Sequence, residues 1–282
     1  MIPMIVAMRR IHPTAIISPE AELGEDVDIG PYCIVDGKVR LERGVRLVAQ
    51  VYLQGPVCIG EETRVFPGAT IGMAPQDVKF KDGDATAGVV IGARCLIREN
   101  VTIHAATKAD VPTRVGDRAF MMVGSHMGHD TSIGNGVIMV NGAGLAGHST
   151  VGDNVTMSGF AMVHQFCRVG RFAFMSGRAG ITQDLPPFCI LAERNGLIGI
   201  NVVGLRRAGM PREQITALRA VYRDVFRPTL TRSEMQEILD ERGRDCPPIA
   251  EMADFVRASK RGVCRAMRRA EAEDPVELGD AV

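Results

Sequence analysis

The hydrophobic pattern of this chain repeats every six residues over most of its length. An aliphatic side chain, methionine included, occupies every sixth position in three runs, from Ile11 to Ile71, from Ile91 to Ile103 and from Val115 to Ile181. A small or β-branched residue, such as Cys33 or Ser125, follows four positions after most of them. A period of six fits neither an α-helix nor an alternating strand. It predicts a parallel β-helix, in which each hexapeptide forms one short strand and one corner around an aliphatic interior.

Two polar segments interrupt this rhythm. We expect the β-helix to span residues 11–187, with loops ejected from it at 73–90 and 105–114. Pro186 and Pro187 mark its end because proline cannot continue a hydrogen-bonded strand. Loops that leave a regular solenoid are common places for function, so both are candidate parts of a site.

The six-residue pattern ends at this point. Residues 188–269 are expected to form a connecting segment and a small α-helical domain. The first part, 188–209, has no clear period and is expected to be irregular. Helices are expected to begin at Pro211, after Thr231 and at Pro247, because proline fits the first turn of a helix and threonine is a good N-cap. The fold class is therefore mainly β, followed by helices.

Composition narrows the possible functions. Residues 1–10 form an expected flexible leader, and the acidic tail at 270–282 is expected to be disordered. The formal net charge is zero, so nothing suggests a nucleic-acid partner, and no apolar segment is long enough to span a membrane. The seven cysteines show no zinc-ligand spacing, so no metal is expected, and a reducing cytoplasm is the simplest location.

Five of the six histidines cluster in the central part of the repeat. They are His104, His126, His129, His148 and His164. Their offsets from the aliphatic positions place the last four at corners or on the surface of the coil, outside its interior. Imidazoles that are neutral near pH 7 suit proton transfer, so we expect this cluster to have a function.

Several motifs have a characteristic order and phase along the repeat. They are His12-Pro13-Thr14, Gln76-Asp77-Val78-Lys79-Phe80, His126-Met127-Gly128-His129-Asp130, Leu145-Ala146-Gly147-His148, Val163-His164-Gln165-Phe166 and Gly204-Leu205-Arg206-Arg207. With these motifs the chain closely resembles the acyl-carrier-protein-dependent UDP-N-acetylglucosamine O-acyltransferases of lipid A biosynthesis. The resemblance covers residues 11–265. It implies a left-handed β-helix with three hexapeptides per coil, a homotrimer with sites between neighbouring subunits, and no cofactor.

The resemblance also implies roles for particular residues. His129 matches the general base that activates the sugar 3-hydroxyl, Asp130 would orient its ring, and the Gly147 N–H matches the oxyanion donor. The acyl donor would be an acyl carrier protein loaded with a 3-hydroxyacyl chain. Gly177 matches the position that limits acyl length, and its small size implies a long chain. The remaining matches are substrate contacts: Gln76, Asp77, Lys79, His104, His126, His148, His164, Gln165, Asn201 and Arg207.

Three alternatives stay open on the sequence alone. Val203 and Ala208 depart from the family pattern, and the segment 192–198 is about two residues short. These departures leave room for an N-acyltransferase acting on the 3-amino analogue of the sugar nucleotide. Gamma-type carbonic anhydrases share the β-helix and bind zinc through three histidines. A non-catalytic β-helix scaffold is the third alternative, although the histidines and polar loops disfavour it.

Overall fold

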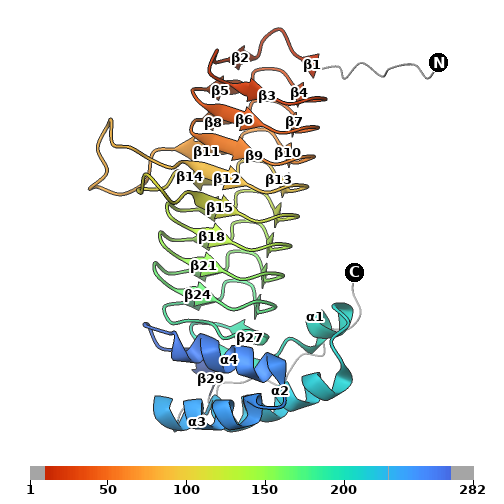
Figure 1. The fold of residues 1–282 in the computed structure, drawn as a ribbon, viewed down its shortest axis with the longest axis vertical. Helices are drawn as coiled ribbons and strands as arrows, with labels where there is room; N and C mark the ends of the chain where they lie inside the picture. The colour runs from red at the N-terminus through yellow and green to blue at the C-terminus, as the bar shows by residue number, and fades with distance from the viewer. Residues whose placement is uncertain (1–9, 228, 268–282) are drawn as a thin grey trace, which may run out of the picture.

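The computed structural model describes residues 10–227 and 229–267. The expected acidic tail and all but the last residue of the expected leader lie outside the described residues. Short strands wind around a single hydrophobic core and build three sheets, A, B and C, in which almost all neighbouring strands are parallel (Figure 1). No helix in the described ranges has the length and apolar character to cross a membrane.

Each sheet takes one strand from every coil. Sheet A contains β1 (Arg10–Ile11), β4 (Asp28–Ile29), β7 (Arg46–Leu47), β10 (Arg64–Val65), β13 (Leu96–Ile97), β16 (Phe120–Met121), β19 (Ile138–Met139), β22 (Thr156–Met157), β25 (Phe174–Met175), β27 (Cys189–Ala192), β28 (Gly196–Ile200) and β29 (Arg265–Ala266). Sheet B contains β2 (Ile16–Ile17), β5 (Ile34–Asp36), β8 (Tyr52–Gln54), β11 (Thr70–Met73), β14 (Thr102–His104), β17 (His126–Met127), β20 (Gly144–Leu145), β23 (Met162–Val163) and β26 (Gly180–Ile181). Sheet C contains β3 (Glu22–Leu23), β6 (Val39–Leu41), β9 (Val57–Ile59), β12 (Val89–Ile91), β15 (Thr113–Val115), β18 (Ser132–Ile133), β21 (Thr150–Val151) and β24 (Arg168–Val169).

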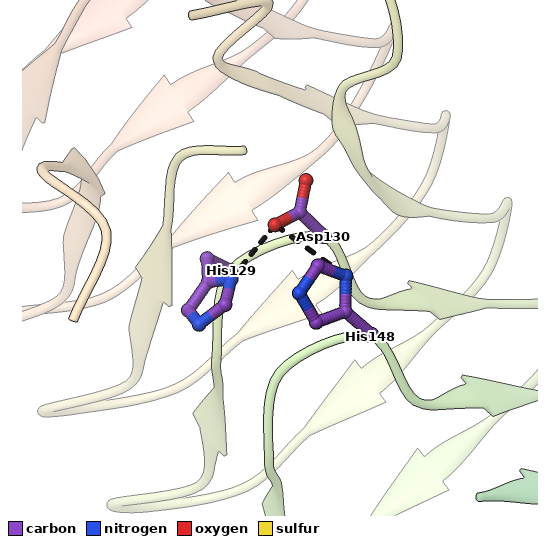
Figure 2. Close-up of side chains that lie close together, drawn as sticks. All are labelled: His129, Asp130 and His148. Carbon is purple, nitrogen blue, oxygen red and sulfur yellow. Dashed lines mark hydrogen bonds and ion pairs between the residues drawn. The ribbon is translucent and has the colours of Figure 1, made fainter. Parts of the chain in front are cut away.

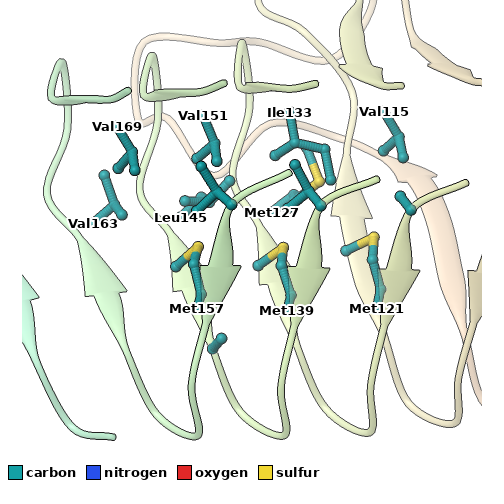
Figure 3. Close-up of a cluster of buried hydrophobic side chains, with 14 of the residues drawn as sticks. Val115, Met121, Met127, Ile133, Met139, Leu145, Val151, Met157, Val163 and Val169 are labelled. Atoms are coloured by element: carbon teal, nitrogen blue, oxygen red, sulfur yellow. The ribbon is translucent and has the colours of Figure 1, made fainter. Parts of the chain in front are cut away.

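The six-residue pattern builds the core in columns. In regular coils a residue pairs with the one 18 positions later, so identical positions of successive coils stack, as Met121 stacks on Met139 and Met139 on Met157 (Figure 3). These methionines are fully buried. At the open N-terminal end the column is uncovered, and Ile11 is 45% exposed. Burial of the repeated aliphatic side chains is therefore the main stabilising contribution to the coil.

Both ejected loops leave the prism at the same edge, between sheets B and C. The first, 74–88, joins β11 to β12, and the second, 105–112, joins β14 to β15 (Figure 1). The strands β12 and β15 begin inside the segments that the sequence assigns to the loops. Both loops are therefore slightly shorter than the sequence predicts. The loops also hydrogen-bond to each other, because Ala87 N donates to Lys108 O at 2.7 Å.

The segment 188–209 is not irregular, which corrects the sequence expectation. β27 continues sheet A beyond Pro187 by pairing in parallel with β25, and β28 returns antiparallel to it. The buried Cys189 and Leu191 alternate with the partly exposed Ile190, which is the pattern of a half-buried strand. The hairpin thereby closes one end of the core.

Four helices follow the hairpin within the described residues. They are α1 (Val202–Arg207), α2 (Arg212–Val225), α3 (Arg232–Gly243) and α4 (Pro247–Arg257). Pro211 directly precedes α2, Thr231 and Glu234 form a capping box at α3, and α4 begins with Pro247. These starts agree with the helix signals in the sequence. The helices cover the C-terminal end of the prism (Figure 1).

An ion pair with a buried carboxylate fastens α4 to the prism. The Asp184 carboxylate, whose side chain is 2% exposed, accepts from Arg168 Nε at 3.0 Å and from Arg168 N at 2.8 Å. The same guanidinium donates to the carbonyl oxygen of Phe255 in α4 at 2.7 Å. One side chain thus joins the last coil to the last helix.

We expect Asp184→Ala to lower the free energy of unfolding by about 2 kcal/mol, because it removes a buried carboxylate that accepts two hydrogen bonds from Arg168. Arg40→Ala is the matched control, since the Arg40–Glu42 pair is exposed and is expected to contribute less than about 1 kcal/mol. Urea denaturation of both variants measures the difference. Equal losses in the two variants would contradict the proposed fastening.

Candidate functional site

The site lies on the B–C edge of the prism, at the corners that follow sheet B. His129 and Asp130 lie between β17 and β18, and Gly147 and His148 occupy the same places one coil later. Asp130, His148 and Phe166 are 18 residues apart and share a left-handed backbone conformation, with φ of 57°, 61° and 63°. The repeat therefore stacks their side chains in one column.

His129 and Asp130 form a hydrogen-bonded dyad (Figure 2). His129 Nδ1 lies 2.7 Å from Asp130 Oδ2, and the two side chains are only 12% and 6% exposed. Burial alone would raise the pKa of the Asp130 carboxyl, but hydrogen bonds from His129 and Thr107 outweigh it and hold the pKa below its usual value. An ionised Asp130 accepts a hydrogen bond from Nδ1–H of His129, and in the neutral ring this leaves the lone pair of Nε2 free. That is the state required of a general base.

His148 lies near the same oxygen of the Asp130 carboxylate. Its Nδ1 is 3.7 Å from Asp130 Oδ2, and its ring stands edge-on to His129 with centroids 5.0 Å apart. Phe166 stacks on His148 with centroids 4.7 Å apart and the planes 3° from parallel. Sequence reasoning did not single out Phe166, although its distance of 18 residues from His148 was a visible signal.

Gly147 lies directly beside the His129 ring. A Cβ at this position would come within 2.7 Å of both Cε1 and Nε2. No protein acceptor receives the Gly147 N–H within the described ranges. At another edge the equivalent N–H groups of Asp117 and Asn135 are bonded to side chains of the following coil, at 2.8 and 2.6 Å. The corner at Gly147 therefore offers an N–H donor next to a base.

His104 and His126 form a second histidine pair near this edge. Their ring centroids are 5.4 Å apart. His126 Nδ1 is 2.7 Å from Thr102 Oγ1, and His104 Nδ1 is 2.7 Å from the carbonyl oxygen of Ala74 at the start of the first loop. Burial, and to a lesser degree the neighbouring His104, lowers the pKa of His126. Neutral His126 can therefore exchange hydrogen bonds with a polar ligand near pH 7.

The lowered pKa of His126 makes folding stability depend on pH. The pKa of a histidine in the unfolded chain is about 6.5, and that of folded His126 is lower. As pH falls below about 6.5, the unfolded chain binds a proton at this residue before the folded protein does. The free energy of unfolding therefore decreases as pH falls through this range. We expect His126→Gln to flatten this decline. Urea denaturation at several pH values measures it, with His12→Gln at an exposed position as the control for removing one histidine. An unchanged slope in His126→Gln would contradict the expectation.

The remaining predicted residues are distributed over the molecule. Asp77 lies in the first loop, where its Oδ1 accepts from Lys79 N at 2.9 Å, and the side chains of Gln76 and Lys79 are exposed. His164 and Gln165 are exposed on the B–C edge, next to the dyad column. The structure thus places the two loops and most of the predicted histidines along one edge.

Three predicted residues lie elsewhere. Gly177 is at the corner between β25 and β26, on the A–B edge. Asn201 caps α1 through Gly204 N and donates to the carbonyl oxygen of Phe172, on the edge between sheets C and A. Arg207 is exposed in the last turn of α1. A single chain therefore does not bring these residues to the dyad.

The geometry of His129, Asp130 and His148 also bears on metal binding. Their nearest donor atoms lie within 4.8 Å of one another, which is close enough to surround an ion. However, Asp130 already accepts hydrogen bonds from Thr107 and His129. These bonds account for the close approach of His129 and Asp130 by hydrogen bonding.

Comparisons with known proteins point to one family. The family model described as UDP-N-acetylglucosamine O-acyltransferase, domain 2, matches residues 184–264. An acyl-(acyl-carrier-protein)–UDP-N-acetylglucosamine O-acyltransferase of Thermodesulfovibrio yellowstonii is 44% identical over 92% of this chain and 100% of its own length. A protein of the same name from Azorhizobium caulinodans is 46% identical over 94% of this chain and 98% of its own.

Solved structures give the same result. A UDP-N-acetylglucosamine acyltransferase from Bacteroides fragilis superposes with a TM-score of 0.85 and 37% identity, covering 90% of this chain and 100% of its own. The corresponding enzyme of Francisella novicida gives a TM-score of 0.88 and 33% identity, covering 96% of this chain and 100% of its own. The similarity includes the β-helix and the helical end together.

Proposed function

The chain belongs to the acyl-(acyl-carrier-protein)–UDP-N-acetylglucosamine O-acyltransferase family, and we propose that its His129–Asp130 dyad carries the transfer reaction. It is an acyltransferase of lipid A biosynthesis, which moves an acyl chain from acyl carrier protein to UDP-N-acetylglucosamine. The observation that carries the proposal is the dyad itself. A buried carboxylate fixes Nδ1 of His129 at 2.7 Å and leaves Nε2 as a base beside the Gly147 N–H.

In the proposed mechanism, Nε2 of His129 takes the proton of the sugar 3-hydroxyl as its oxygen attacks the thioester carbonyl. The ionised Asp130 stabilises the resulting imidazolium. The Gly147 N–H donates to the oxyanion of the tetrahedral intermediate. When the intermediate collapses, the carbon–sulfur bond breaks and the thiolate of the carrier receives the proton from His129. The products are the 3-O-acyl sugar nucleotide and the free carrier thiol.

We assign substrate contacts to the polar residues along the edge of this dyad and to Arg207 in α1, which a neighbouring subunit would bring to the site. Asp77 and Lys79 on the first loop would contact the sugar nucleotide, together with Gln76, while Arg207 has the charge to bind the diphosphate. His126, with its lowered pKa, is suited to hydrogen-bond sugar hydroxyl groups as a neutral ring. His104, His148, His164 and Gln165 border the same edge.

We propose a left-handed coil and a homotrimer with sites between subunits. The predicted site residues occupy three edges of the prism: the dyad on the B–C edge, Gly177 on the A–B edge and Asn201 on the C–A edge. Edges of a prism are separated by its faces, so only a neighbouring subunit can bring a second edge to the dyad. The outer face of sheet A supplies apolar side chains for such a contact, among them Leu96, Phe120, Ile138 and Phe174.

The acyl carrier protein needs a surface of complementary charge. A groove on the helical domain combines three exposed arginines with apolar side chains: Arg206, Met210, Arg212, Ile215, Thr216 and Arg219. We assign the docking of the acidic carrier to this groove, because opposite charges guide association and apolar contacts hold it. The seven cysteines are free, which supports placing the reaction in the reducing cytoplasm.

We expect the enzyme to prefer a long 3-hydroxyacyl chain. A Cβ at Gly177 would meet only the Gly159 carbonyl oxygen, at 3.7 Å, so the position is open. Gly177→Met would fill this space and should shift the preferred chain to a shorter one. Competition between carrier proteins loaded with chains of different length measures the preference. An unshifted preference in Gly177→Met would remove Gly177 from the acyl pocket.

One assay tests the function as a whole. Purified protein receives a mixture of 3-hydroxyacyl carrier proteins with either UDP-N-acetylglucosamine or its 3-amino analogue, and mass spectrometry identifies the products. The names of the relatives favour the hydroxyl acceptor. Ester product from UDP-N-acetylglucosamine is therefore expected. Amide product from the amino sugar alone would overturn the assignment of the acceptor, and no product from either would overturn the proposed function.

A further inference from the structure

The second ejected loop contributes one residue that binds both oxygens of the Asp130 carboxylate. Thr107 N donates to Oδ1 at 3.1 Å, and Thr107 Oγ1 donates to Oδ2 at 2.7 Å. We propose that Thr107 is a positioning residue, which aims this carboxylate at His129 and so keeps the base in its active tautomer. The proposal rests on the function of His129 given above and adds a residue that the sequence motifs did not contain.

Asp130 needs such a guide because it lies between two histidines. Its Oδ2 is 2.7 Å from Nδ1 of His129 and 3.7 Å from Nδ1 of His148. Both distances are measured from the same oxygen, so a rotation that moved Oδ2 away from His129 would break the bond that sets its tautomer. Two donors on two different oxygens fix the plane of the carboxylate. The backbone is held as well, because Asp130 N donates to Thr113 Oγ1 at 2.9 Å.

Thr107 is itself held from both sides by the first loop. Ala106 N donates to Gly88 O at 3.2 Å, and Ala87 N donates to Lys108 O at 2.7 Å. The residues before and after Thr107 are therefore tied to the C-terminal end of loop 74–88. Backbone hydrogen bonds therefore join loop 74–88, which we assign to sugar binding, to the segment that carries Thr107.

The variants Thr107→Val and Thr107→Ser distinguish the contribution of the hydroxyl group from that of the side-chain shape. Valine keeps the shape and the backbone donor but loses the bond to Oδ2, so kcat should fall by about tenfold, while KM for the sugar nucleotide should change little. Serine retains the hydroxyl and should restore most of the rate. Thr63→Val is the matched control, because Thr63 Oγ1 donates to Gly92 O at 2.8 Å on the edge between sheets C and A, away from Asp130 and from both loops.

A second readout does not depend on activity. Nitrogen-15 NMR of histidine-labelled protein reports which ring nitrogen of His129 is protonated, with His129→Ala used to assign its signals. Wild type, Thr107→Ser and Thr63→Val should show Nδ1–H, and Thr107→Val should show a mixture of tautomers. An unchanged tautomer in Thr107→Val, or an equal loss of kcat in Thr63→Val, would overturn the positioning role. An inactive wild type that still showed these tautomers would refute only the proposed function.

Discussion

Replacing His129 by alanine is expected to lower kcat/KM by about a thousandfold. The variant loses the group that we propose takes the proton from the sugar hydroxyl, and general-base catalysis typically contributes about 10² to 10⁴ in rate. The loss should appear mainly in kcat, because the proton moves in the transition state and sugar binding is shared with other residues. Steady-state kinetics with loaded carrier protein measures it.

The control for this experiment is His12→Ala. His12 is exposed at the N-terminal end of the prism, where its Nδ1 lies 2.9 Å from Thr14 Oγ1. Its loss should change kcat/KM by less than about twofold, as expected for a surface substitution remote from a site. Thermal denaturation of both variants establishes that they are folded. A folded His129→Ala enzyme with a nearly normal rate would exclude His129 as the base.

Most of the fold could be predicted because its core is periodic. Every sixth residue from Val115 to Ile181 is buried, so one rule accounts for the strands of the central and C-terminal coils. The hairpin formed by β27 and β28 could not be predicted in this way. It consists of only two strands, and Gly196 and Gly199 interrupt the apolar pattern that would have revealed them.

The site likewise contains residues that the period could predict and residues that it could not. The column of Asp130, His148 and Phe166 follows the period of 18 and could have been found by counting. Thr107 could not, because it lies in a loop that breaks the period: the strands on either side of the break pair Val89 with Thr113, 24 positions apart. Periodicity places residues within the coil, whereas contacts made by an ejected loop depend on its three-dimensional path. The positioning residue therefore became visible only in the structure.

Gly147→Ala is expected to reduce kcat by about a hundredfold, although it adds only one methyl group. The new Cβ would lie 2.7 Å from both Nε2 and Cε1 of His129, closer than real Cβ atoms approach other atoms. Either the ring or the corner must move. A ring displaced by about 1 Å no longer has its base aligned with the hydroxyl, and such misplacement costs about 10² in rate. The backbone of Gly147 is not left-handed, so alanine itself introduces no conformational strain there.

A double-mutant cycle tests whether the loss of kcat in Gly147→Ala is caused by displacement of the His129 ring. In the His129→Ala background the added methyl group meets no imidazole, so Gly147→Ala should cost much less there than in wild type. Gly199→Ala is the matched control, because its Cβ would meet nothing within 4 Å and its backbone is also ordinary. If Gly147→Ala cost the same factor in both backgrounds, the methyl group would be acting on the oxyanion donor or on the fold. A loss that disappears with the imidazole would instead mean that this corner carries glycine to make room for the base.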